Sequence, residues 1–249
     1  MSKCEWQGDV YDRVSGPQKA FGEAVLERLQ LDGDETVLDA GCGSGRVTEL
    51  LLERLPRGRV IAVDQSPSMV EAARERLSGP VRVEVQDLLA LTVPEPLDAV
   101  LSTSTFHWID DHGRLFERLH AALRPGGRLV AQCGGEGNIT ELRSRGQAVL
   151  ERAPYAEHML GWRPPWNYAG AEKTRERLLG AGFTSAECWL EPSPVTLEQP
   201  REFLPTVIFA PHIQRLPEQL HESFIDALLA ELGEPVVVDY VRLNMDAVA

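Results

Sequence analysis

The chain has 249 residues, of which 43% are hydrophobic and 25% charged, an ordinary composition for a globular protein with a sizeable core. Its 25 Lys and Arg residues stand against 38 Asp and Glu residues, which gives a net charge of −13. A surface with this excess of negative charge repels a nucleic-acid backbone and an anionic membrane, so we expect neither as a partner.

The first residues contain neither an apolar signal core nor an Arg- and Ser-rich transit pattern, and no apolar run is long enough to span a bilayer. We therefore expect a cytoplasmic protein, and for its assembly we expect a monomer or a homodimer. The four cysteines form no CxxC pair, and no cluster of His and Asp has the spacing of metal ligands. No metal requirement is expected.

Strands and helices alternate along most of the chain, after an amphipathic helical stretch in residues 1–32. Five strands, each followed by a helix or a crossover, are predicted at Thr36–Asp39, Arg59–Val63, Val81–Val85, Asp98–Ser102 and Arg128–Cys133. Two further strands are expected at Ser185–Leu190 and Val236–Leu243, among helices at 138–151, 171–179, 200–213 and 216–232. This order indicates an α/β protein with a parallel sheet and helices on both faces.

The stretch VLDAGCGSGRVT, residues 37–48, joins the first of these strands to a helix through three alternate glycines. Such a turn lets the backbone approach a small polar ligand, because glycine has no Cβ and adopts positive φ at little cost. A dinucleotide site would place its third glycine one residue later, and a P-loop would need a Gly-Lys-Ser or Gly-Lys-Thr step after the turn. Both phosphate-binding interpretations are therefore disfavoured.

Acidic residues end three successive strands: Asp39, Asp64 and Asp87. Asp64 follows Gly45 by 19 residues, where a carboxylate can accept hydrogen bonds from both hydroxyls of an adenosine ribose. A ligand with adenine, ribose and a cationic amino-acid tail would explain an acid at each of these three strand ends without any phosphate contact. S-adenosylmethionine fits this description.

These motifs resemble those of the class I S-adenosylmethionine-dependent methyltransferases. The similar segments are VLDAGCGSG, VIAVDQSPSMV, VEVQDL, LDAVLSTSTFHWI and LRPGGRLV, which occur in this order within residues 33–134. The resemblance implies a Rossmann-like sheet of seven mostly parallel strands in which the last strand runs antiparallel to the others. It also implies one domain, with residues 1–32 as a helical lid, 33–134 as the cofactor-binding core, 135–170 as a substrate-covering insertion, and 171–249 as C-terminal helices and strands.

The resemblance also implies roles for single residues. Gly41, Gly43 and Gly45, with the small Cys42 among them, would pack against the methionine part of the cofactor, while Asp39 faces its ammonium group directly or through water. Asp64 would hold the ribose and Asp87 the adenine amino group. The remaining cofactor contacts implied are Gln65 and Met69 on one adenine face, Leu88 on the other, Thr103 near the amino-acid end, and Tyr11 from the lid.

The segment Phe106–Trp108 would lie where the transferred methyl group points, and its Trp-bearing form resembles the carboxyl O-methyltransferases of trans-aconitate, juvenile hormone acid and malonyl carrier protein. The spacing of Trp6, Tyr11 and Gln18 is similar to the lid of the juvenile hormone acid enzymes. This resemblance implies that Gln18 and Trp108 hold a substrate carboxylate. Four residues of the insertion are candidates for lining the site of an apolar acid, or for packing that fixes the loop: Trp162, Arg163, Trp166 and Tyr168.

His107 keeps a second interpretation open. A carboxylate is already ionised at neutral pH and needs no base, whereas a hydroxyl, amine, thiol or carbon acceptor usually does. His107 could serve as that base, or it could be a structural residue bonded locally. A catalytically silent cofactor-binding regulator and an NAD-dependent dehydrogenase are the remaining alternatives.

Overall fold

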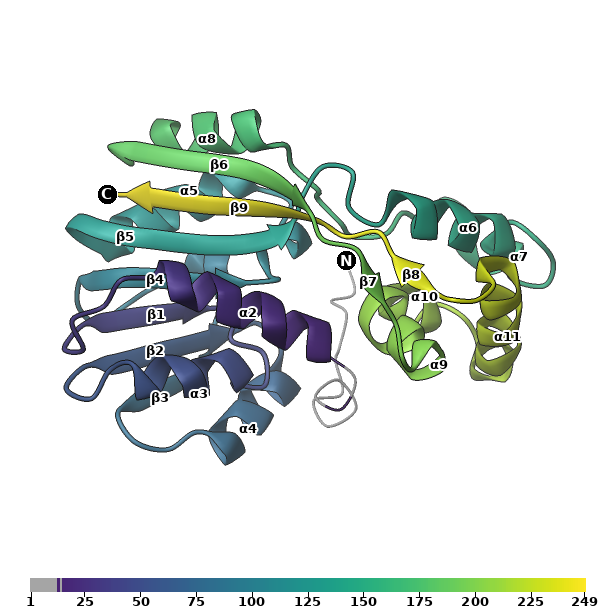
Figure 1. Ribbon diagram of the computed structural model, residues 1–249, viewed down its shortest axis with the longest axis horizontal. Coiled ribbons are helices and arrows are strands. Elements are labelled where there is room, and N and C mark those ends of the chain that lie inside the picture. The colour runs from purple at the N-terminus through teal and green to yellow at the C-terminus, as the bar shows by residue number, and fades with distance from the viewer. Residues whose placement is uncertain (1–12, 14) are drawn as a thin grey trace.

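The computed structural model describes residue 13 and residues 15–249. Its centre is a seven-stranded sheet in the order β3-β2-β1-β4-β5-β9-β6 (Figure 1). The strands are β1 (Thr36–Ala40), β2 (Arg59–Asp64), β3 (Val81–Val85), β4 (Leu97–Thr103), β5 (Leu123–Gly134), β6 (Ser185–Pro192) and β9 (Val241–Val248). The first five run parallel, whereas β9 is antiparallel to its neighbours β5 and β6. The predicted Rossmann-like fold class is confirmed.

Helices cover both faces of this sheet (Figure 1). One face carries α2 (Gly16–Arg28), α3 (Arg46–Glu53) and α4 (Pro67–Arg76), and the other carries α5 (His112–Ala122) and α8 (Ala171–Gly180). Successive strand side chains point to opposite faces, so Val37 packs with the first group and Leu38 with the second. The near-continuous apolar strands therefore build two separate cores.

A helical lobe, which we define as residues 136–170 and 193–240, lies beyond one end of the sheet (Figure 1). It contains α6 (Thr140–Leu150), α7 (Ala156–Met159), α9 (Pro200–Phe203), a π-helical turn (Leu204–Ile208), α10 (Ala210–Ile213), a 3-10 turn (Glu218–Leu220), α11 (His221–Leu232) and the short strands β7 (Val195–Thr196) and β8 (Val237–Val238).

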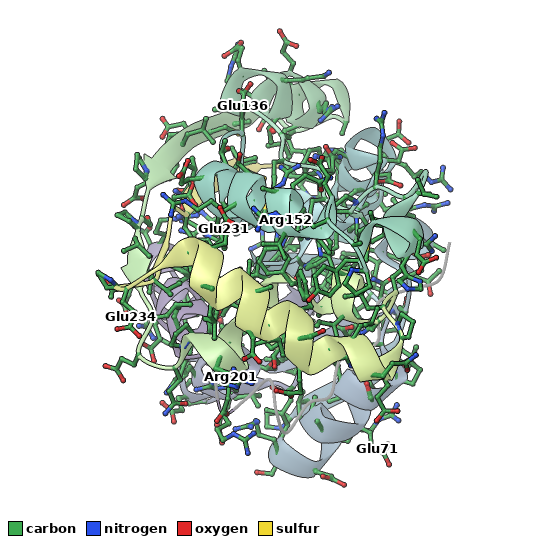
Figure 2. The ribbon with its side chains drawn as sticks, turned by 90° about the vertical axis from the view of Figure 1, so that its right-hand side faces the viewer. Glu71, Glu136, Arg152, Arg201, Glu231 and Glu234 are labelled. Atoms are coloured by element: carbon green, nitrogen blue, oxygen red, sulfur yellow. The ribbon has the colours of Figure 1, made fainter. Side chains whose placement is uncertain are left out.

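Two distant parts of the chain share the core of this lobe. Leu142 and Val149 of α6 belong to the same buried cluster as Phe209 and Phe224. On the surface, Arg152 forms an ion pair of 2.7 Å with Glu231 of α11 (Figure 2). Helix α6 therefore packs together with the later helices of the lobe.

Several element boundaries differ from the sequence-based prediction, three of them with a clear cause. The final strand begins at Val241 and not at Val236, because Val237 and Val238 pair with β7 in a separate ribbon. The helix expected at 200–213 is interrupted around Pro205, whose ring leaves no N–H to donate, and Phe209 bonds to the carbonyl of Leu204 in a π-turn. The fifth strand begins at Leu123 and not at Arg128, and its pairing with β4 shifts register between Leu97 and Ala99.

Of the predicted lid, the structure describes α2 and the residues beside it, so Trp6 and Tyr11 lie outside the described residues. Among the described helices, none combines the length and the apolar character that crossing a membrane requires.

Candidate functional site

A cavity of ≈ 310 Å³ lies where the carboxyl ends of β1 to β4 meet α2, β9 and the helical lobe. Ligands of open α/β sheets bind at this edge, at the point where the strand order reverses. We call the part formed by the glycine loop, Asp64, Met69, Asp87 and Leu88 the strand-end half. The part formed by Gln18, His107, Trp108, Trp166, Tyr168 and Arg242 is called the aromatic half.

The three glycines of the loop have different structural roles. Gly41, at φ 85°, leaves no room for a Cβ, which would lie 2.2 Å from the hydroxyl of Thr105. Gly43, at φ 54°, lines the cavity, and a Cβ added to it would point into open space. Gly45, at φ 84°, is the N-cap of α3, faces Leu77, and does not line the cavity. Gly45 therefore differs from Gly41 and Gly43 in its surroundings, because side chains of the neighbouring helix occupy the side where a Cβ would lie.

Asp64 is held in place by the loop that it faces. Its Oδ2 accepts the N–H of Gly43 at 3.0 Å and its Oδ1 accepts the N–H of Ser66 at 2.9 Å. Burial raises the pKa of Asp64, and these backbone donors partly counter that effect. Each carboxylate oxygen has further lone-pair capacity, so this side chain can still accept hydrogen bonds from two hydroxyls in the cavity.

The other predicted residues of the strand-end half are brought together as expected. Asp87 follows β3 and caps the 3-10 helix Leu88–Ala90 by accepting the N–H of Leu89 at 2.9 Å. Thr103 stands at the end of β4. The residues that line the cavity here are Cys42, Gln65, Met69, Asp87, Leu88 and Thr103.

Asp39 lies behind the loop and not on the cavity surface. Its Oδ2 accepts a hydrogen bond of 2.6 Å from Thr48, whereas its Oδ1 is buried without a partner among the described residues. Burial and the charge of Asp64 raise the pKa of Asp39 to about 6. Because this buried oxygen lacks a hydrogen-bond partner and lies behind the glycine loop, it could accept a hydrogen bond from a water that in turn contacts a cationic group in the cavity.

The aromatic half gathers residues that are distant in sequence. Gln18 of α2 donates to the hydroxyl of Tyr240 at 2.9 Å. Trp108 belongs to the 3-10 helix η2 (Phe106–Trp108) after β4, and its ring centroid is 6.4 Å from that of Trp166. Trp166 in turn stacks on Tyr168 at 5.9 Å. Val207 and Ile208 add an apolar wall from the helical lobe.

The segment that carries Trp166 is fixed against η2 by Asn167. Its backbone N–H donates to the carbonyl of His107 at 2.8 Å, and its side chain donates to the carbonyls of Ile109 and Asp110, each at 3.0 Å. These bonds place the aromatic rings over the cavity. They also explain why a Pro- and Trp-rich segment without helix or strand has a defined position.

Trp162 and Arg163 do not line the cavity, and the packing of Trp162 corresponds to the second of the two sequence-based alternatives. The ring of Trp162 packs edge-on against His212 at 4.8 Å, with the guanidinium of Arg215 5.9 Å from its centroid. Arg163 is exposed. The chain turns at Gly161, with φ 67°, so the two residues face the lobe and the solvent.

Sequence reasoning missed Arg242, which is 2% exposed and lines the cavity from β9. Its Nε donates to Gln132 at 3.1 Å, one of its terminal nitrogens donates to Ser104 at 2.8 Å, and its guanidinium lies 4.6 Å from the ring centroid of Phe21. In a strand with alternating residues, an Arg is typical of the solvent-facing side. This face of β9 is buried because helix α2 covers it, which the strand's own sequence does not show.

Comparisons with known proteins identify the family of the chain. Residues 37–127 match the methyltransferase domain family. The chain is 30% identical over 196 residues to the trans-aconitate 2-methyltransferase of Methylobacterium nodulans, which covers 78% of this chain and 70% of that protein. It is 34% identical over 135 residues to the malonyl-acyl-carrier-protein O-methyltransferase of Acetivibrio thermocellus, 53% of this chain and 48% of that protein. The chain thus spans about half the length of some of these relatives.

Solved structures show the same fold at lower identity. The YcgJ protein of Bacillus subtilis superposes with a TM-score of 0.64 at 14% identity, over 92% of this chain and 97% of that chain. A phosphoethanolamine N-methyltransferase of Haemonchus contortus, solved with S-adenosyl-L-methionine, gives a TM-score of 0.59 at 21% identity, over 91% of this chain and 51% of that chain.

Proposed function

Since the chain belongs to the class I S-adenosylmethionine-dependent methyltransferases, we propose that it methylates a carboxylate oxygen of a small, largely apolar acid. S-adenosylmethionine supplies an electrophilic methyl group, which the carboxylate oxygen attacks while the carbon–sulfur bond breaks and its electron pair remains on the sulfur. The products are a methyl ester and S-adenosylhomocysteine. No proton is removed, so the protein has to orient the two reactants and exclude water.

The strand-end half suits the nucleoside. Asp64 would accept hydrogen bonds from the ribose hydroxyls, and Asp87 would accept one from the adenine amino group, with Met69 and Leu88 against the adenine faces. The open space beside Gly43 admits the methionine part. The unpartnered Oδ1 of Asp39 would receive the ammonium group through water, because Asp39 does not reach the cavity surface.

The proposal rests on the aromatic half, whose lining differs chemically from the carboxylate-lined strand-end half. Aromatic rings and the aliphatic side chains of Val207 and Ile208 form its walls, and the guanidinium of Arg242 lines it. Positive charge next to apolar walls favours an acceptor that has an anionic group at one end and an otherwise apolar skeleton. Relatives named trans-aconitate 2-methyltransferase and malonyl-acyl-carrier-protein O-methyltransferase support an acid as the acceptor. A tricarboxylate would bring further negative charges against Val207 and Ile208, so we expect a monocarboxylate.

A matched set of acceptors tests this proposal. We would incubate the protein with methyl-labelled S-adenosylmethionine and acids, amides, alcohols and amines that share the same apolar skeletons, and identify products by mass spectrometry. The expected product is a methyl ester from an apolar acid, with trans-aconitate at least about tenfold slower. Methylation of the alcohol or amine in place of the acid would contradict the carboxyl assignment. Tight cofactor binding without any product would favour the silent regulator.

A further inference from the structure

His107 has a defined protonation pattern in the aromatic half. Its Nδ1 accepts the backbone N–H of Gly134 at 3.3 Å. An atom that accepts an N–H must present a lone pair, so a neutral imidazole here carries its proton on Nε2. Nε2 has no hydrogen-bond partner among the described residues, and His107 lines the cavity. The ring therefore offers the cavity a donor and not an acceptor.

We propose that His107 binds the acceptor by donating its Nε2 hydrogen to the carboxylate oxygen that does not attack, which leaves the other oxygen free to face the methyl group. This inference rests on the proposed function and assigns one residue to its substrate. A group with one fixed N–H selects an acceptor with spare lone pairs, as a carboxylate has, and offers no lone pair to an ammonium group.

The neighbours of the ring keep it in position and neutral. Its centroid is 5.1 Å from that of Trp108 and 5.8 Å from that of Tyr168, and His107 is only 8% exposed. Burial lowers the pKa of His107 well below its usual value, and the charges of Arg242 on β9 and His112 on α5 act in the same direction.

Two further titratable groups near the ring, Tyr168 and Cys133, are also uncharged at neutral pH. Burial raises the pKa of the Tyr168 phenol above its usual value and the pKa of the Cys133 thiol to about 12. No described carboxylate acts on the ring strongly enough to favour its charged form. The sequence-based alternative of His107 as a base therefore does not suit this geometry, because Nε2 already carries a proton and Nδ1 is occupied.

Two substitutions separate the two nitrogens of the ring. In His107→Gln the amide nitrogen reaches the place of Nε2 and keeps a donor in the cavity. In His107→Asn the amide oxygen takes the place of Nδ1 and keeps the bond to Gly134, but no donor reaches the cavity. We expect kcat/KM for the acid to fall about 10- to 100-fold in the Asn variant, the usual range for a hydrogen bond to a charged group, and about three- to fivefold in the Gln variant.

Controls distinguish this loss from misfolding. The affinity for S-adenosylhomocysteine should stay within about twofold of wild type in both variants, and His158→Asn, outside the cavity, should leave turnover unchanged. The wild-type rate should be flat between about pH 6 and 8, because a neutral donor does not titrate there. A fall in rate near pH 6.5, or equal losses in the Gln and Asn variants, would overturn the role of His107.

A spectroscopic measurement does not depend on turnover. Long-range 15N–1H correlation spectra of the histidine rings should show His107 protonated at Nε2 and unprotonated at Nδ1 from pH 6 to 8. A proton on Nδ1 would refute the donor role even if acids are methylated. Turnover of alcohols or amines, but of no acid, would refute the proposed function and the carboxylate contact together, whatever the spectrum shows.

Discussion

The two halves of the cavity are built in different ways. In the strand-end half, Asp64 is the last residue of β2 and Asp87 lies just after β3, and backbone N–H groups 2 or 21 residues away in sequence hold them in place. In the aromatic half, Gln18, His107, Trp166 and Arg242 come from four separate parts of the chain. The first half carries carboxylates, and the second carries aromatic rings and a buried guanidinium.

This difference separates two tasks. Residues fixed by short strand-to-helix connections suit a ligand that a whole family shares, because the geometry follows from the sheet. Residues supplied by α2, β9 and the helical lobe can change without disturbing the sheet, which suits a site for a variable acceptor. Substitutions in one half should therefore leave the ligand of the other half nearly unaffected.

Asp39→Asn tests how much folding free energy the buried carboxylates of the strand-end half cost. Of the substitutions proposed, we expect it to have the largest effect. The pKa of Asp39 in the folded protein, about 6, lies above its value in the unfolded chain. Between about pH 4 and 6 the folded protein therefore binds more protons than the unfolded chain, so its stability falls as the pH rises through that window. Above pH 6 the full penalty remains, about 3 kcal/mol for a rise of about two pKa units.

The neutral Asn removes this penalty. Urea unfolding of the ligand-free protein at pH 7.5 should show the variant up to about 3 kcal/mol more stable than wild type, with the difference shrinking towards pH 4. Its affinity for S-adenosylmethionine should fall. Asp34→Asn, at an exposed position, serves as the control. An unchanged pH slope would show that Asp39 is not destabilised in the folded state.

Asp64→Asn tests whether the strand-end half binds the nucleoside independently. We expect the dissociation constant of S-adenosylhomocysteine to rise about 100-fold, because the variant loses the charged acceptor and its amide group would face the N–H of Gly43 or Ser66. Titration calorimetry measures it, with the exposed Glu71→Gln on α4 as the matched control. A large rise in the acceptor KM at saturating cofactor would contradict the separation.

Trp108→Ala tests the aromatic half and is paired with Trp162→Ala. Trp108 lines the cavity and Trp162 does not, so kcat/KM for the acceptor should fall about tenfold in the first variant and less than about twofold in the second. Cofactor affinity should stay within about twofold of wild type in both. Steady-state kinetics with calorimetry gives both values. Equal losses of acceptor turnover would mean that Trp162 reaches the substrate after all.

Most of the strand-end half could be predicted from sequence, because each of its residues occupies a fixed place after a recognisable strand. Sequence alone did not show that Gly45, which has the positive φ of a loop glycine, faces Leu77 at the C-cap of α4 and not the cavity. Which of the two alternatives holds for Trp162 and Arg163 could not be decided from sequence, since composition marks a segment as a cover for the substrate without saying which side chains turn inwards. Arg242 and Ser104 were missed because their meeting depends on how β9 is inserted between β5 and β6.

The sequence by itself determined the alternation of strands and helices, the glycine loop and the acids at the strand ends, because these depend on residues close together in the chain. Tertiary structure decided which aromatic rings line the cavity, that Arg242 is buried there, and which nitrogen of His107 faces it. Those properties arise from contacts between residues more than a hundred positions apart, such as Arg242 and Ser104, and from the backbone bond of Gly134 to His107. Local patterns carry no information on such contacts until the chain has folded.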